Sequence, residues 1–155
     1  MNRPLPRYLY RVYDEESCSQ FNRASGFVAS IPNAVYNPEH RNARRQLKQH
    51  MNWGNRYRTP FISVTGSREK ALEYALQRVE MGRRTVSIVK IDSSRLERAN
   101  IDVYRMCDLV EQIGAYIKPE ANNEHEYLCV RRIPANAVIE CLTLDDDDDE
   151  DSDEY

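Results

Sequence analysis

The sequence predicts a single domain of the α+β class, in which strands and short helices are mixed along one chain. Its 155 residues, 41% hydrophobic and 30% charged, supply enough apolar surface for one core but not for two independent domains. Segments rich in aromatic and β-branched residues are interspersed with amphipathic segments of helical period, and no internal repeat is visible. We therefore expect one folded domain over residues 1–144.

Residues 145–155 read DDDDDEDSDEY and contain nine of the 25 acidic residues of the chain. Without these nine, the formal net charge of the chain is +6 rather than −3. A run of like charges repels itself and buries no apolar surface, so we expect a disordered acidic tail. We favour a solubilising appendage over a tail that folds back on the basic body.

The first half of the chain predicts a strand, two helices and a loop between them. Residues 8–13 (YLYRVY) are aromatic and β-branched, which favours a first strand. Three acidic residues open segment 14–21, as the first turn of a helix prefers. Segment 23–37 has no period and is expected to be a loop. Segment 38–53 begins with a proline and ends before a glycine, which predicts a basic helix.

The middle of the chain predicts a strand followed directly by a helix. Residues 61–64 are a short apolar segment, and Ser67 then caps an amphipathic helix that ends near Gly82. Residues 85–91 (TVSIVKI) are the clearest strand pattern in the chain, and a turn is expected over residues 92–96.

The last third of the chain gives weaker signals at first. Residues 101–104 have a strand pattern and residues 108–113 a helical one. Two further apolar strands are expected over residues 126–130 and 138–144, joined by a turn that contains a proline and an asparagine.

Several classes of protein are not supported by the sequence. No stretch reaches the roughly 18 uninterrupted apolar residues of a membrane span, and the start of the chain has arginines where a signal peptide has its apolar run. We therefore expect an intracellular, most simply cytoplasmic, protein without a membrane partner. The four cysteines form no C-x-x-C pair and are expected to be reduced, with Cys129 and Cys141 inside buried strands. No metal is expected, because the cysteines and histidines lack the short spacing of a zinc site.

Polar side chains interrupt three apolar strand segments: Arg11, then Ser63 and Thr65, then Glu124 and Glu126. Buried polar groups need partners, so mutual pairing or a bound ligand is implied. The planar guanidinium of an arginine suits a phosphate or a carboxylate. Glu124 and Glu126, two apart in the expected strand, are expected to share a face. Spacing alone is equally consistent with a structural ion pair between Arg11 and Glu126.

Three segments occur in a fixed order along the chain, LYRVYD at residues 9–14, FISVT at residues 61–65 and EHEYLCVRRIP at residues 124–134. Together they resemble the ADP-ribosyltransferases of the cholera and pertussis toxin type, over about residues 7–144. The resemblance implies split, mixed β-sheets with short helices. It also implies that the side chains of Arg11, Ser63 and Glu126 meet in one cleft.

The resemblance implies a role for each matched residue. Arg11 looks like the first-strand arginine that contacts the NAD phosphates and supports the site. Ser63 looks like the first serine of the family's S-T-S motif, which orients the catalytic glutamate. Glu126 looks like that glutamate, which holds a hydroxyl of the nicotinamide ribose and stabilises the cation that forms as nicotinamide leaves. Glu124 looks like the upstream acid that handles the acceptor guanidinium in arginine-modifying relatives.

Three further residues belong to the expected NAD site. The last position of the S-T-S motif is Thr65 here, and its central hydroxyl is missing because residue 64 is a valine. Gly26 would let the main chain approach the ligand closely. His50 matches a histidine that some relatives use near the nicotinamide ribose, although we favour a surface position on the basic helix.

The sequence therefore predicts a mono-ADP-ribosyltransferase with NAD as its substrate and an unidentified protein acceptor, arginine being one candidate side chain. One alternative is a non-catalytic domain that keeps the fold and the ligand but not turnover. Another is an NAD glycohydrolase with water as its acceptor. Nucleic acid is not an expected partner, since the basic residues of segment 38–53 fit an ordinary solvated helix face.

Overall fold

The structure is a computed structural model that describes residues 4–30, 32, 36, 37, 39, 42–51, 59–113 and 124–145. The strands of this part of the chain are β1 (Tyr8–Tyr13), β2 (Phe21–Asn22), β3 (Gly26–Val28), β4 (Phe61–Thr65), β5 (Thr85–Asp92), β6 (Val103–Arg105), β7 (Glu126–Val130), β8 (Arg132–Ile133) and β9 (Val138–Asp145). The helices are α1 (Asn42–Met51), α2 (Arg68–Glu80), α3 (Ser93–Arg98) and α4 (Met106–Ile113), with a 3₁₀ turn η1 (Ala135–Ala137) before β9.

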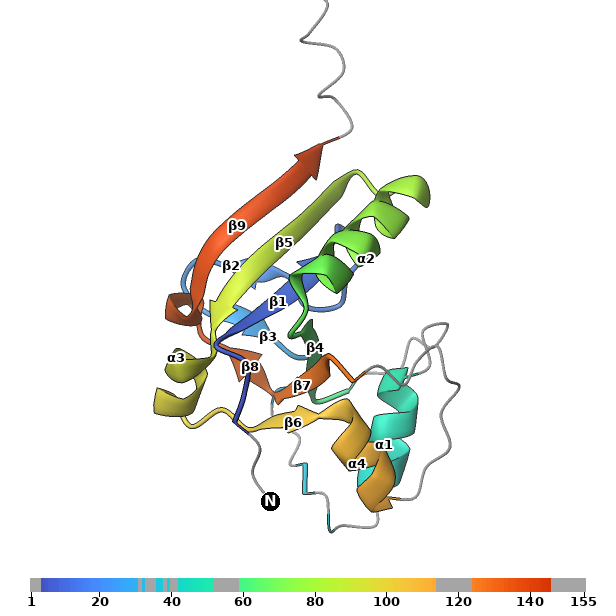
Figure 1. The fold of residues 1–155 in the computed structure, drawn as a ribbon, viewed down its shortest axis with the longest axis vertical. Coiled ribbons are helices and arrows are strands. Elements are labelled where there is room, and N and C mark those ends of the chain that lie inside the picture. Colours follow the sequence, from blue (N-terminus) through green and yellow to red (C-terminus); the bar gives the residue numbers. More distant parts are fainter. Residues whose placement is uncertain are drawn as a thin grey trace, which may run out of the picture.

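Two sheets carry the fold (Figure 1). The larger has the strand order β6-β7-β4-β1-β5-β9, and the smaller has the order β2-β3-β8. Every strand pair in the described residues is antiparallel, so the sheets are antiparallel rather than mixed. The predicted α+β class with two sheets and short helices is confirmed.

The six-stranded sheet has a different neighbour on each face. One face packs against the small sheet, in a core of Leu9, Ile62, Val64, Val89, Cys129 and the fully buried Phe27 of β3. On the opposite face, α2 covers β1 and β5 with its buried Ala71 and Ala75. Further along the same face, α1 and α4 bury Leu47 and Leu109 against Phe61 and Leu128. The candidate site lies on this second face.

A backbone kink at Arg131 carries the chain from one sheet to the other. Its φ of +74° lies in the left-handed region, between the end of β7 and the start of β8. The kink is held by two short main-chain bonds, from Arg131 N to the carbonyl of Pro60 (2.7 Å) and from Ala29 N to the carbonyl of Arg131 (2.7 Å). The late strand segment of the sequence therefore contributes to both sheets.

Most of the predicted elements are confirmed within a few residues. Ser67 is the N-cap of α2, and its side chain accepts from Lys70 N at 3.2 Å. The helix expected over residues 38–53 is α1, of which the structure describes residues 42–51. The strand expected over 138–144 extends to Asp145, which lies opposite Thr85. The rest of the acidic tail, residues 146–155, lies outside the described residues.

Three predicted elements are wrong. Segment 14–21 is a turn that leads into β2 rather than a helix, and the buried Asp14 binds the main chain of Glu16 and the guanidinium of Arg78 there. The loop expected over 23–37 contains strand β3. The turn expected over 92–96 is the start of helix α3, since the side chain of Asp92 caps it by accepting from Ser94 N.

The cysteines follow the prediction only in part. All four are free thiols, and Cys129 is buried as expected. Cys141 is exposed, so its predicted burial is wrong. The reason is the topology, since β9 is the last strand of the sheet and neither sheet nor helix covers its outer residues.

Candidate functional site

The register of β4 and β7 brings Ser63 and Glu126 to the same face of the six-stranded sheet. Ser63 lies opposite Leu128, and Thr65 lies opposite Glu126. Residues that oppose each other, and residues two apart in one strand, share a face. Ser63 and Glu126 are therefore diagonal neighbours, an arrangement that places their positions about 7–8 Å apart.

His50, near the end of α1, holds the hydroxyl of Ser63. The distance from His50 Nε2 to Ser63 Oγ is 2.6 Å, and that from His50 Nδ1 to Thr59 Oγ1 is 2.7 Å. Burial, and then the cation of Arg11, lower the pKa of His50 from 6.5 to about 4. At pH 7 the imidazole is therefore neutral, with one nitrogen donating and the other accepting.

The surface position favoured for His50 is wrong. Its ring packs edge-on against Phe61, with ring centroids 5.4 Å apart, and both ring nitrogens are bonded to hydroxyls. The preference for a surface position came from the charged neighbours of His50 in the helix, of which Arg44, Arg45 and Lys48 are exposed. His50 instead belongs to the face of α1 that meets β4.

Two hydrogen bonds between the Ser30 hydroxyl and the main chain of Thr59 support the histidine, and they were missed in the sequence. Thr59 N donates to Ser30 Oγ at 3.0 Å, and Ser30 Oγ donates to the carbonyl of Thr59 at 3.2 Å. This pair fixes the buried Thr59, whose hydroxyl contacts His50. No sequence signal could have found it, because Ser30 and Thr59 are 29 residues apart and both lie in segments without a period.

The carboxyl group of Glu126 is partly buried and has no hydrogen bond or ion pair with another described residue. Burial alone raises its pKa from 4.5 to about 7. A carboxyl group in this state is half ionised near neutral pH. Its ionised form would be stabilised most by a cationic group of a bound ligand.

Arg11 approaches the site from the other face of the sheet. Tyr10 lies opposite Thr65 and shares the face of Ser63, so the next residue, Arg11, leaves β1 on the opposite side. Its Nη1 donates to the carbonyl of Ser63 at 3.1 Å, and its Nη2 donates to the carbonyl of Ser19 at 3.0 Å. The expectation that Arg11, Ser63 and Glu126 meet by their side chains is therefore wrong for Arg11, which contacts the main chain of Ser63.

The guanidinium of Arg11 is a buried cation without a carboxylate partner among the described residues. Only 8% of the residue is exposed, and the charge lies 5.0 Å from the centre of the Phe27 ring. Burial, and then the cation of Arg78, lower the pKa of Arg11 to about 10, so it remains charged at pH 7. Its Nε has no hydrogen-bond partner. The structure shows one role for Arg11, which is to hold strand β4 through the carbonyl of Ser63.

Thr65 and Gly26 have structural roles that account for their presence. Thr65 Oγ1 accepts from Ser67 N at 3.2 Å and shapes the turn into α2. Gly26 has a φ of +76°, and a Cβ there would lie 2.0 Å from the carbonyl oxygen of Ile133 and 2.6 Å from the nitrogen of Ala135. The close approach expected at Gly26 is therefore to the chain between β8 and η1 rather than to a ligand.

Glu124 lies in the turn before β7 and is exposed. Its Oε1 is 3.5 Å from His125 Nε2, and its carbonyl accepts from Arg105 Nε at 3.2 Å. The expectation that Glu124 and Glu126 share a strand face is wrong, because β7 begins only at Glu126. Glu124 is nevertheless next to the strand end that carries Glu126.

The described residues contain neither a candidate metal site nor a candidate membrane-spanning helix. No three side chains of histidine, cysteine, aspartate or glutamate are grouped there as a metal ion would require. In the same part of the chain, no helix is long and apolar enough to cross a membrane.

Residues 4–147 match the model of a protein family described as a domain of unknown function, DUF7587. The chain belongs to this family. No curated protein matches the DUF7587 chain. Among solved structures it is similar to EcPltA, a pertussis-like toxin A chain and ADP-ribosyltransferase, with a TM-score of 0.60 and 18% sequence identity over 92% of this chain and 78% of EcPltA. At this identity the likeness shows that the DUF7587 chain has the fold of an ADP-ribosylating toxin subunit.

Proposed function

We propose that the protein binds NAD and transfers its ADP-ribose to a protein acceptor, with Glu126 as the catalytic residue. The observation that carries this proposal is the carboxyl group of Glu126, partly buried, without a partner among the described residues, and diagonal to the Ser63–His50 pair. An isolated structural carboxyl group would be expected to find a partner or to lie in water. The toxin-like fold supports the choice of NAD as the ligand.

The reaction breaks the bond between C1′ of the ribose and the nicotinamide nitrogen, and the electron pair leaves with neutral nicotinamide. The sugar becomes an oxocarbenium-like cation, which an ionised carboxylate stabilises more strongly than it stabilises the ground state. The nicotinamide ring of NAD is itself cationic, so its approach would favour the ionised form of Glu126. The acceptor nucleophile then bonds to C1′ and loses its proton.

The neutral His50 and the hydroxyl of Ser63 have a positioning role in this proposal. The imidazole bonds both Ser63 and Thr59, so the Ser63 hydroxyl is held in place before any ligand arrives. An uncharged ring is suited to this place, because a second cation beside the nicotinamide would oppose binding.

Arg11 supports an anionic ligand in a second way. A buried guanidinium with carbonyl partners and no carboxylate leaves net positive charge in the protein interior. The pyrophosphate of NAD would lower the energy of that charge even without direct contact. The prediction that Arg11 contacts the phosphates themselves remains a proposal, and the buried Nε, which has no hydrogen-bond partner, is the donor left for such a contact.

Release of nicotinamide from NAD by the purified protein tests the proposal. The wild-type chain is expected to release nicotinamide, and Glu126→Gln is expected to reduce the rate by 100-fold or more, on the order of the 3 kcal/mol that one electrostatic group supplies. Glu73→Gln, which alters an exposed glutamate on α2, is the matched control. No release by the wild-type chain, together with unchanged NAD binding in Glu126→Gln, would leave only a binding domain and refute the proposed catalysis.

The acceptor is addressed separately through Glu124. If Glu124 handles an acceptor guanidinium, Glu124→Gln is expected to abolish transfer to arginine-like acceptors while nicotinamide release continues. Glu126→Gln is expected to abolish both. Equal loss of both activities in the two variants would contradict this division of roles, and unchanged transfer in Glu124→Gln would show that Glu124 is an ordinary solvated residue.

A further inference from the structure

Strand β9 is an open edge of the six-stranded sheet. Its inner side pairs with β5 from Thr85–Asp145 to Ile91–Val138, and no described residue pairs with its outer side. A long open edge presents a row of main-chain donors and acceptors, which soluble proteins usually protect with lysine, proline or a covering segment. The sequence of β9, VIECLTLD, has neither lysine nor proline. A register shift leaves Ile139 unpaired with β5, so the regular part of the edge runs from Glu140 to Asp145.

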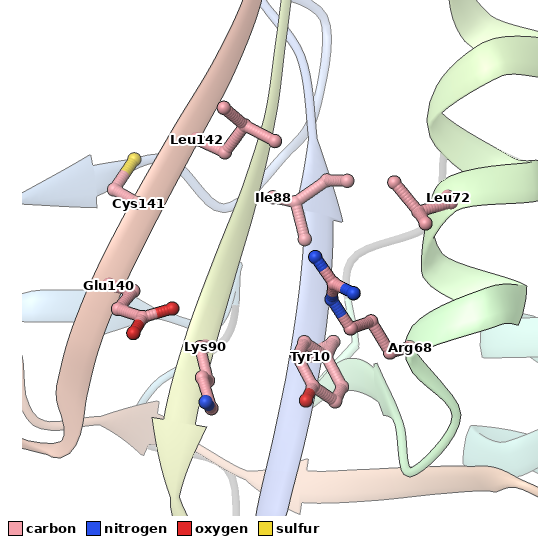
Figure 2. Close-up of a pocket in the computed structure, with 8 residues that line it drawn as sticks. All are labelled: Tyr10, Arg68, Leu72, Ile88, Lys90, Glu140, Cys141 and Leu142. Carbon is pink, nitrogen blue, oxygen red and sulfur yellow. The ribbon is translucent and has the colours of Figure 1, made fainter.

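Apolar side chains are exposed along this edge. Leu142 is 52% exposed and Ile139 is 38% exposed, and Cys141 between them is exposed as well. Figure 2 shows Leu142 of β9 on the outer wall of a groove that Ile88 of the neighbouring β5 and Leu72 of α2 also line. The groove has a volume of about 520 Å³, and helix α2 covers only its inner side.

A basic hollow lies at the start of β9. It has a volume of about 330 Å³ and is lined by Arg95, Arg98, Ala99 and Asn136. Arg95 bonds the carbonyl of Asn136 in η1, the turn that leads directly into β9, and its Nε lies 3.8 Å from Asp92 Oδ2. Arg98 has no ion pair with a described residue and is the cation that is left without one in the hollow. Figure 1 shows α3 beside the start of β9, whereas the C-terminal end of β9 lies far from α3. The hollow thus places two arginines at one end of the strand, and the acidic run of the sequence begins at the other.

We propose that a second copy of this chain docks along the outer edge of β9, antiparallel, with Cys141 opposite Cys141 of the second copy. In this register Leu142 lies opposite Glu140 of the second copy, and Asp145 lies opposite its Ala137. The acidic residues that follow Asp145 then meet Arg95 and Arg98 of the other chain. The two sheets become one continuous sheet, and each end of the shared edge joins an acidic run to a basic hollow.

The start and end of β9 are about 23 Å apart at 3.3 Å per residue. Within one chain Asp145 therefore lies at the far end of the strand from Arg95 and Arg98, whereas in the antiparallel pair it approaches these arginines of the second copy.

The pairing of two strands alone is too small for a tight dimer, since stable interfaces bury roughly 1,200–2,000 Å². The acidic residues are therefore expected to supply much of the affinity, and the dimer should weaken with salt. The edge β9 is separated from β4, the strand of Ser63, by β5 and β1. Dimer formation is therefore expected to leave the candidate site open, and nicotinamide release per chain unchanged.

Sedimentation of the full-length chain over a range of concentrations tests the proposal. The wild-type chain is expected to sediment as a concentration-dependent dimer. Leu142→Glu is expected to abolish the dimer, because it places two acidic pairs across the edge, whereas Leu142→Lys retains the dimer by facing Glu140 of the second copy. Val28→Glu is the matched control, since Val28 is 38% exposed and belongs to β3 in the smaller sheet. A dimer that persists in Leu142→Glu, or a wild-type chain that stays monomeric at all concentrations, would overturn the proposal.

Two further variants test the register and the acidic run. Mild oxidation with a copper catalyst is expected to join two chains through Cys141, so Cys141→Ser blocks the crosslink and Cys18→Ser does not, although both cysteines are exposed. A stop codon after Asp145, or about 0.5 M NaCl, is expected to raise the dissociation constant at least tenfold. A crosslink that depends on Cys18, or a dimer indifferent to both the truncation and salt, would show that another surface forms it.

Discussion

The carboxyl group of Glu126 makes the protein less stable as the pH rises through neutrality. Its pKa is about 7 in the folded chain and near 4.5 in the unfolded chain. Below pH 4.5 the carboxyl group is protonated in both states, and the folded state has no buried charge. Above pH 7 the folded state holds a partly buried carboxylate that the unfolded state exposes to water. A difference of 2.5 pH units, at about 1.4 kcal/mol per unit, gives an upper value of about 3.5 kcal/mol for the loss of stability.

Glu126→Gln removes this dependence, since glutamine has nearly the same shape and does not ionise. The variant is expected to gain stability relative to the wild-type chain as the pH rises, by about 2–3 kcal/mol between pH 4 and pH 8. Urea unfolding followed at pH 4, 6 and 8 measures the difference, because the free energy extrapolated to water is obtained at each pH. The gain in stability would accompany the loss of nicotinamide release, as at sites that keep a functional group in an unfavourable place.

Glu124→Gln, two residues earlier and exposed, controls for the removal of one formal charge, and its effect on stability is expected to stay within about 0.5 kcal/mol. If Glu126→Gln and the wild-type chain differ in stability by the same amount at all three pH values, the carboxyl group is not held away from water. The reasoning about Glu126, including its part in the proposed catalysis, would then fail.

Three other perturbations follow from the geometry. Gly26→Ala is expected to destabilise the fold by more than about 3 kcal/mol in thermal unfolding. Gly82→Ala, which also has a positive φ but has open space around it, is expected to cost about 1 kcal/mol. Equal effects of the two substitutions would contradict the steric explanation. The imidazole of His50 is expected to titrate by NMR with a midpoint of about 4, and a midpoint near 6.5 would place it in water. Arg11→Met is expected to lower the free energy of unfolding by about 2–4 kcal/mol, because the carbonyls of Ser63 and Ser19 lose their donors. The same substitution is expected to raise the pKa of His50. An unchanged melting temperature would show that water replaces the guanidinium.

The sequence predicted the elements that carry their own local signals. The strand at residues 85–91 and the helix after Ser67 were recognised because alternation and capping are written into adjacent residues. The short strands β2, β3 and β8 were missed, since two or three residues carry no period. They exist because Phe27 is buried against the large sheet and Gly26 lets its main chain meet the chain after Ile133.

The candidate site was predictable by residue and not by geometry. Ser63, Glu126 and His50 were all named from the sequence, yet the bond between His50 and Ser63 depends on how α1 packs on β4. Nothing in the spacing of positions 50 and 63 specifies that contact. The position of Glu124 was misjudged because two glutamates two residues apart were assigned to one strand face, whereas Glu124 lies in the turn before β7.

Arg11 explains why an arginine occurs in the middle of an apolar strand. Strands β1 and β4 share a single ladder pair, Tyr10 with Thr65, so the carbonyl of Ser63 has no main-chain donor from β1. The guanidinium supplies that donor from the opposite face of the sheet. The same charge helps to keep His50 neutral, and the neutral imidazole holds the Ser63 hydroxyl. One buried cation thus fixes the main chain of Ser63 on one face and, through His50, its side chain on the other.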